Sequence, residues 1–128
     1  MGKTKQWTWI LGIVLTVVGI LGYLQQPVLG IFEVDGPHNL VHLLSGIIGI
    51  LAALGGEMYA KTYLKVFGVI YAIVFILGLF QDKILGIIGA NFADGLLHLV
   101  IAAIALYGGF GKAKGSTAMN MPPSTPGV

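Results

Sequence analysis

Two pairs of polar residues with the chemistry of metal ligands stand at the start of two strongly apolar stretches. His38 and His42 are four residues apart in "HNLVH", and Asp94 and His98 are four apart in "DGLLH". Residues at this spacing share one face of a helix. Imidazole and carboxylate groups bind divalent metals such as Zn²⁺, which takes four ligands, or three and a water molecule. His38, His42, Asp94 and His98 are therefore candidate metal ligands.

The polar residues that neighbour these pairs predict supporting roles. Asp35 and Asn91 stand three residues before His38 and Asp94. Asp and Asn are favoured N-cap residues, so each is expected to cap the helix that follows it. Asn39 is expected to orient a metal ligand from behind through its amide group.

The same four candidate ligands have two other interpretations. In the first turns of their helices they can satisfy free backbone N–H groups, and His42 and His98 can hydrogen-bond each other and hold two helices together. A haem, a quinone or another small ligand is a third interpretation, although no haem motif accompanies the histidines. We place the structural polar cluster first and the metal site second.

The elements that must position these residues are membrane-spanning helices. Of the 128 residues, 56% are apolar and only 9% are charged, with a mean hydropathy of +0.91. Such a small chain with so few charges is suited to a bilayer rather than to water. Four apolar runs approach the length of a membrane span: 7–24, 38–54, 63–80 and 94–110. The sequence predicts an all-α membrane protein with four transmembrane helices, and the few scattered lysines exclude a nucleic-acid partner.

An internal repeat relates the two halves of the chain. With an offset of 56 residues, segment 9–53 matches segment 65–109 at 13 of 45 positions without a gap, and His42 meets His98. Each unit contains two spans, which predicts two parallel helical hairpins related by a pseudo-twofold axis along the membrane normal. The second and fourth helices are expected to be adjacent at this axis. Gly12 and Gly68 are expected to allow close packing within each hairpin.

The distribution of lysine predicts how the chain is oriented. Six of the seven lysines lie near the two termini or around the start of the third run, and only Lys83 lies on the other side. The positive-inside rule therefore predicts a multi-pass protein of the cell (inner) membrane with both termini in the cytoplasm. Aromatic residues near the cytoplasmic ends resemble an interfacial belt: Trp7, Trp9, Tyr59, Tyr63 and Tyr107. Residues 1–111 form the predicted transmembrane domain, and the polar, Pro-rich segment 112–128 is expected to be a disordered cytoplasmic tail.

Two segments carry a resemblance to a known family. They are "LGIFEVDGPHNLVHLLSG" at 29–46 and "NFADGLLHL" at 91–99. They resemble two sequence motifs of an uncharacterised family of small four-helix bacterial membrane proteins, and the similarity extends over 9–110. The chain differs from the family pattern at Asp35 and at Gly95, where the family has Asn. The resemblance implies the four-helix fold and brings no activity with it.

Three classes of function follow from these observations. The first is a small integral membrane protein with a structural or interaction role, which forms a homo-oligomer or joins a larger membrane complex. The second is a membrane protein that binds a divalent metal or small ligand at the histidine cluster. The third is an enzyme, which we do not expect because no further general acid or nucleophile accompanies the four residues. The absence of cysteine excludes thiolate ligands and cysteine nucleophiles.

Overall fold

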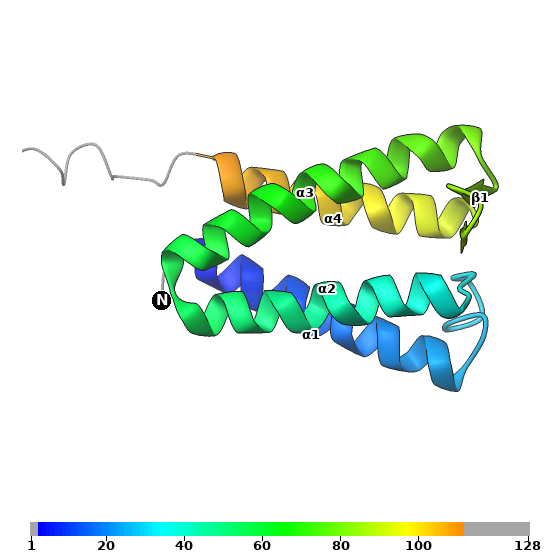
Figure 1. The fold of residues 1–128 in the computed structure, drawn as a ribbon, viewed down its shortest axis with the longest axis horizontal. Helices are drawn as coiled ribbons and strands as arrows, with labels where there is room; N and C mark the ends of the chain where they lie inside the picture. The colour runs from blue at the N-terminus through cyan, green and yellow to red at the C-terminus, as the bar shows by residue number, and fades with distance from the viewer. Residues whose placement is uncertain (1–2, 112–128) are drawn as a thin grey trace, which may run out of the picture.

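Four long helices make up most of the protein. The computed structural model describes residues 3–111. The elements in chain order are α1 (Lys3–Leu24), α2 (Gly36–Gly55), α3 (Glu57–Phe80), β1 (Lys83–Ile84), β2 (Ile88–Gly89) and α4 (Phe92–Phe110). The four predicted helices are confirmed, and each is long and apolar enough to cross a membrane (Figure 1). The predicted tail, 112–128, lies outside the described residues.

Polar caps extend two of the helices beyond their apolar runs. At the start of α2, the Asp35 side chain accepts a hydrogen bond from the His38 backbone N–H at 2.9 Å, and a proline follows within the first turn. At the start of α4, Asn91 and Asp94 form a capping box, in which each side chain accepts from the other's backbone N–H. Both predicted N-caps are confirmed. Polar first turns carry little hydrophobic signal, so α2 and α4 each begin two residues before the runs that predicted them.

The connections between helices lie at two opposite ends of the bundle. Gly56 alone separates α2 from α3, with a φ of +121°, a backbone conformation that glycine adopts without a steric penalty. The longer connections, 25–35 and 81–91, lie together at the other end, which we call the loop end (Figure 1). The N-terminal end of α1 lies at the same end as Gly56. The histidine pairs of α2 and α4 therefore both start at the loop end.

The two long connections adopt the same local conformation. Leu29 and Gly30 have φ values of 53° and 74°, and the residues 56 positions later, Leu85 and Gly86, have 54° and 73°. In each connection a glutamine side chain at the preceding helix end accepts a hydrogen bond from the leucine N–H, Gln25 in the first and Gln81 in the second. The second connection contains the short antiparallel pair β1–β2, and the first has a single bridge between Val28 and Phe32 at the corresponding place. The sequence did not predict this pairing.

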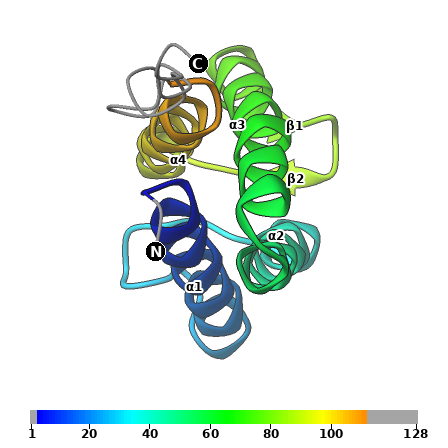
Figure 2. The same cartoon turned by 90° about the vertical axis from the view of Figure 1, so that its left-hand side faces the viewer.

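The helices pack most extensively as two pairs, α1 with α2 and α3 with α4 (Figure 2). Gly12 lies against the backbone of Gly46 and Ile50 of α2, and Gly68 lies against Leu106 of α4, as expected for close-packing glycines. The expected adjacency of α2 and α4 is wrong at the backbone level. Within residues 3–111, no Cα atoms of these two helices come within 8 Å of each other, whereas α1 and α3 contact each other directly.

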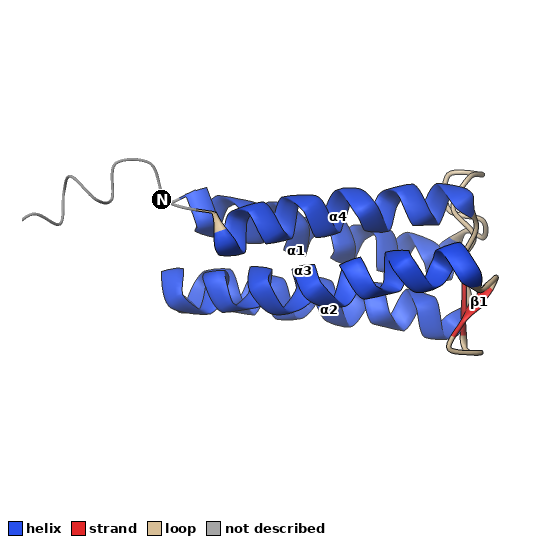
Figure 3. Cartoon of the chain, turned by 90° about the horizontal axis from the view of Figure 1, so that it is seen from above, coloured by secondary structure: helices blue, strands red, loops and turns tan. Residues whose placement is uncertain are grey.

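The apolar core lies toward the middle of the bundle, and the outer surface is also apolar. The buried core residues are Leu11, Leu15, Tyr63, Leu64, Tyr71, Ile101, Ala102 and Ala105. Many large aliphatic side chains point outward along all four helices, which lie side by side along their length (Figure 3). A continuous exposed apolar surface of this kind is typical of a lipid-facing bundle and not of a water-soluble domain.

Candidate metal centre

Three histidines from two helices meet inside the loop end of the bundle. His38 and His42 come from the first two turns of α2, and His98 comes from the second turn of α4. All three side chains are buried, with 1%, 1% and 2% of their surface exposed. Each offers a ring nitrogen, and these nitrogens lie within 4.8 Å of one another. The sequence therefore identified three side chains that the fold brings together.

A backbone carbonyl from the other half of the chain fixes the orientation of His38. Its Nδ1 atom lies 2.6 Å from the carbonyl oxygen of Gly89 in β2. A carbonyl oxygen only accepts, so Nδ1 carries the hydrogen and the lone pair resides on Nε2. Nε2 is buried and has no hydrogen-bond partner within the described part of the chain. Metal-bound histidines are held in this way, with one nitrogen donating to a carbonyl and the other facing the ion.

His42 lies one helical turn further along α2 from the loop end than His38. Its ring centroid lies 4.5 Å from that of His38 and 5.9 Å from that of His98, and the His38 and His98 centroids are 5.5 Å apart. Both ring nitrogens of His42 are buried, and neither has a hydrogen-bond partner among residues 3–111. A buried polar atom without a partner costs free energy, and a ligand bound to this ring would remove part of that cost.

Asp94, the fourth predicted ligand, lies beside the cluster but is not one of the three residues whose ligand atoms converge. Its Oδ2 atom accepts from the Asn91 N–H at 2.9 Å as part of the capping box. Its Oδ1 atom is buried and unpartnered within the described residues. The carboxylate lies near the His38 side chain. Its role as a ligand stays a prediction.

The two N-cap residues join the two long connections to each other. Asp35 accepts the Gly89 N–H through Oδ2 at 2.8 Å, in addition to capping α2, and Asn91 donates from Nδ2 to the Ile31 carbonyl at 2.8 Å. Burial by itself raises the pKa of Asp35, but hydrogen bonds from the backbone N–H groups of His38 and Gly89 outweigh it and hold the pKa below its ordinary value. The carboxylate is therefore charged at neutral pH and ties β2 to the start of α2.

Asn39, the expected supporting residue, faces the neighbouring helix α1. Its side chain is fully buried and packs against the backbone of Gly22, where a Cβ atom would overlap the amide. Neither amide atom has a hydrogen-bond partner within residues 3–111. No contact between this amide and the histidine rings supports an orienting role, which stays a prediction.

Sequence reasoning missed two tyrosines beneath the histidines. The Tyr71 ring lies 5.7 Å from His98 and 6.4 Å from His42, and its hydroxyl donates to Ser45 Oγ at 3.3 Å. Tyr63 donates to the Ser45 carbonyl at 2.8 Å and is only 4% exposed. The assignment of Tyr63 to an interfacial aromatic belt is therefore wrong. An inward tyrosine has the same sequence signal as an outward one when both faces of a helix are apolar.

The arrangement of the three histidines suits a transition-metal ion. Neutral imidazole binds Zn²⁺, Cu²⁺, Fe²⁺ and Ni²⁺, and a zinc–nitrogen bond is about 2.0–2.1 Å long. Ring nitrogens within 4.8 Å of one another need only small side-chain rotations to reach one ion. With three protein nitrogens, a fourth position is left for a carboxylate oxygen or water.

Comparison with known proteins identifies a family and assigns no activity. A family model described as "Domain of unknown function (DUF4383)" matches residues 5–111, which include all four helices. Searches of the curated proteins and of the solved structures found no significant match.

Proposed function

Because this chain belongs to the family described as Domain of unknown function (DUF4383), we propose a function from its site: a multi-pass membrane protein that binds one divalent transition-metal ion through His38, His42 and His98. The four apolar helices supply the membrane-spanning frame. The three buried histidines supply the imidazole nitrogens, and the chain has no other histidine. Binding of a metal is the second of the functions that the sequence indicated.

The single observation that carries this proposal is the state of His38. Its Nδ1 donates to the Gly89 carbonyl, while its Nε2 is buried, unpartnered and near two other imidazoles. In a purely structural cluster, we expect buried nitrogens to be paired with each other or with the backbone. The unpaired nitrogens of His38 and His42, which lie near a ring nitrogen of His98, are better explained by an ion that all three residues bind.

A divalent metal ion at this site needs a negative charge nearby to offset part of its own charge. Three neutral imidazoles leave the full charge of an M²⁺ ion uncompensated, which is costly in a site shielded from water. The buried Asp94 carboxylate, whose Oδ1 has no hydrogen-bond partner in the described residues, offers one negative charge beside His38. We propose that Asp94 acts as counter-charge or as fourth ligand, and that Zn²⁺ is the ion the donor set suits best.

The architecture around the site is proposed to be two parallel hairpins related by a pseudo-twofold axis. Support comes from the 56-residue offset, at which the long connections share φ values and glutamine caps. The lysine bias supports cytoplasmic termini in an inner membrane of a bacterial cell, with the loop end on the opposite face. The metal would then lie near the outer surface of the bilayer and join both hairpins.

A second candidate function is a structural or interaction role without a metal. Direct hydrogen bonds between the connection 81–91 and the first half of the chain favour it: Gly89 N–H to Asp35, His38 to the Gly89 carbonyl and Asn91 to the Ile31 carbonyl. These bonds hold the loop end together with no ion present. Under this alternative the protein is a compact scaffold whose exposed apolar surface meets lipid, a second copy or a larger membrane complex.

Absorption spectroscopy with Co²⁺ separates the two functions. Co²⁺ bound by three imidazoles in a four-coordinate site gives visible bands much stronger than those of the hydrated ion. We expect these bands in the detergent-solubilised protein, and we expect His98→Leu to lose them while Asp82→Asn, an exposed acid of the loop end, keeps them. A parent protein that gives only the spectrum of hydrated Co²⁺ would leave the structural function as the better account.

A further inference from the structure

A cavity between α3 and α4 lies where one half of the chain lacks a side chain that the other half has. Asn39 lies over Gly22 in the first half, and its amide fills the space between α2 and α1. The residues 56 positions later are Gly95 and Gly78, so the corresponding space between α4 and α3 has no amide. A Cβ atom placed on Gly95 would meet nothing within 4 Å, and one on Gly78 would meet only Ile84, at 3.6 Å.

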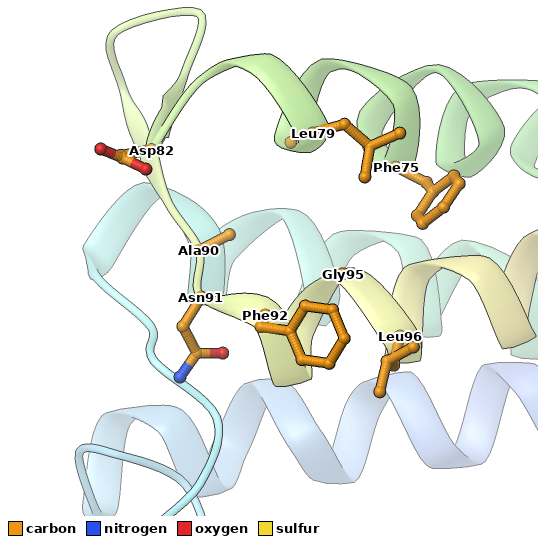
Figure 4. A pocket seen from close by; sticks show the side chains of 9 residues that line it. Phe75, Leu79, Asp82, Ala90, Asn91, Phe92, Gly95 and Leu96 are labelled. Atoms are coloured by element: carbon orange, nitrogen blue, oxygen red, sulfur yellow. The ribbon is translucent and has the colours of Figure 1, made fainter.

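The space left by this difference is a cavity of about 290 Å³. Its walls are the end of α3 and the start of α4, and its lining is mostly apolar: Phe75, Gly78, Leu79, Phe92, Gly95 and Leu96 (Figure 4). Small-molecule sites start at about 300 Å³, so the cavity has room for a narrow apolar group and not for a bulky ligand. Phe92 is 81% exposed and Leu79 is 63% exposed, so the cavity adjoins the surface that meets lipid.

The polar residues of the cavity gather at its end nearest the connection 81–91. Figure 4 shows Asp82 there, with its carboxylate directed away from the apolar lining. Asp82 is exposed, and the neighbouring Lys83 instead interacts with the charge of Asp35. Asn91 also borders this end, but its amide is engaged with the backbone of Ile31 and Asp94. The free negative charge at the polar end therefore belongs to Asp82.

We propose that this cavity binds one phospholipid, with a length of acyl chain between α3 and α4 and a primary ammonium headgroup on Asp82. The apolar lining suits the chain, the position at the end of two membrane spans suits the headgroup depth, and the carboxylate suits a cation that donates N–H groups. Phosphatidylethanolamine has such a headgroup. Phosphatidylcholine has a cation without N–H groups, so it forms no charge-assisted hydrogen bond with Asp82.

Native mass spectrometry of the detergent-solubilised protein tests this site with two lipids of identical chains, phosphatidylethanolamine and phosphatidylcholine. We expect the parent to retain one lipid, with a preference for phosphatidylethanolamine of about two- to fivefold, as an exposed ion pair would give. Gly95→Leu fills the cavity and should lose most of the retained lipid. Asp82→Asn should keep the lipid and lose the preference between headgroups.

Two further variants keep the test decisive. Gly36→Leu adds the same side chain at an open glycine in the other half of the chain and should retain lipid like the parent. If Gly95→Leu does not fold, Gly78→Leu fills the cavity from the opposite wall. The proposal is overturned if a folded, cavity-filled variant retains as much lipid as the parent, or if the parent binds both lipids equally. It is also overturned if filling the cavity changes the oligomeric state and leaves lipid retention unchanged, because the cavity would then be a contact between copies.

Discussion

The Nδ1 atom of His38 lies 2.6 Å from the carbonyl oxygen of Gly89, a residue 51 positions later in the chain. Through this contact, a strand in the second half of the protein determines the tautomer of a histidine in α2. The same strand residue donates its N–H to Asp35, the N-cap of α2. The orientation of the candidate metal ligand therefore depends on the packing of the two halves against each other.

Removing the Asp35 carboxylate should weaken both the fold and metal binding. Asp35→Ala loses the cap of α2 and the bond to the Gly89 N–H, and loss of an N-cap costs about 0.5–2 kcal/mol. With β2 released, the His38 ring loses its fixed orientation, and zinc affinity should fall about 10–100-fold. Thermal unfolding and zinc titration measure the two effects. Asp82→Ala, at an exposed acid of the other long connection, is the control, and equal behaviour of the two variants would contradict this role of Asp35.

Replacing His98 with leucine should have opposite consequences with and without metal. In the presence of a chelator, the variant removes a buried imidazole that lacks an ion, so its melting temperature should equal or exceed that of the parent. With saturating Zn²⁺ the parent gains stability from binding, and the variant does not. Melting curves in detergent under both conditions provide the comparison. A variant that melts well below the parent in chelator would instead identify the histidines as a structural lock.

Glycine packing predicts opposite outcomes for two alanine substitutions. A Cβ atom at Gly12 would lie 2.8 Å from the backbone nitrogen of Ile50, which cannot move aside, so Gly12→Ala should destabilise by about 1–3 kcal/mol. Gly36 has nothing within 4 Å of its Cβ position, so Gly36→Ala should be neutral or slightly stabilising. The free energies of unfolding in detergent measure both changes. A destabilised Gly36→Ala beside an unchanged Gly12→Ala would contradict the packing of α1 on α2.

Cysteine labelling tests the proposed orientation, because the chain has no cysteine of its own. Gly36→Cys and Ile87→Cys place thiols at exposed positions of the loop end, and Lys61→Cys places one near the Gly56 connection. A membrane-impermeant thiol reagent added to intact cells should modify the first two and leave the third unmodified. Labelling of Lys61→Cys alone would reverse the orientation.

The four helices were predicted well from the sequence because apolar runs and capping residues are local features of the chain. The apolar runs gave four helices, and Asp35 and Asn91 marked the starts of α2 and α4 through their capping chemistry. The separation of α2 from α4 was not predicted, because a one-dimensional repeat carries no information on the distance between helices. That distance depends on the packing of all four helices, and α1 and α3 contact each other directly.

The site was predicted in part for a related reason. Polar residues stand out in an apolar chain, so the three histidines were found from their spacing. Tyr71 and Tyr63 were not found, because the lipid-facing and core-facing sides of a membrane helix are equally apolar and leave no periodic signal. The Gly89 carbonyl was also missed, since a backbone partner 51 residues away has no sequence signature.

Equilibrium dialysis against Zn²⁺ tests the central claim most directly. The protein in detergent micelles is dialysed against buffered zinc, and bound metal is measured by elemental analysis for the parent, His38→Leu, His98→Leu and the control Asp82→Asn. We predict one ion per chain for the parent and for the control, with an affinity at least about tenfold lower in each histidine variant. A parent that binds no zinc, or histidine variants that bind it as tightly as the parent does, would contradict a metal centre at His38, His42 and His98.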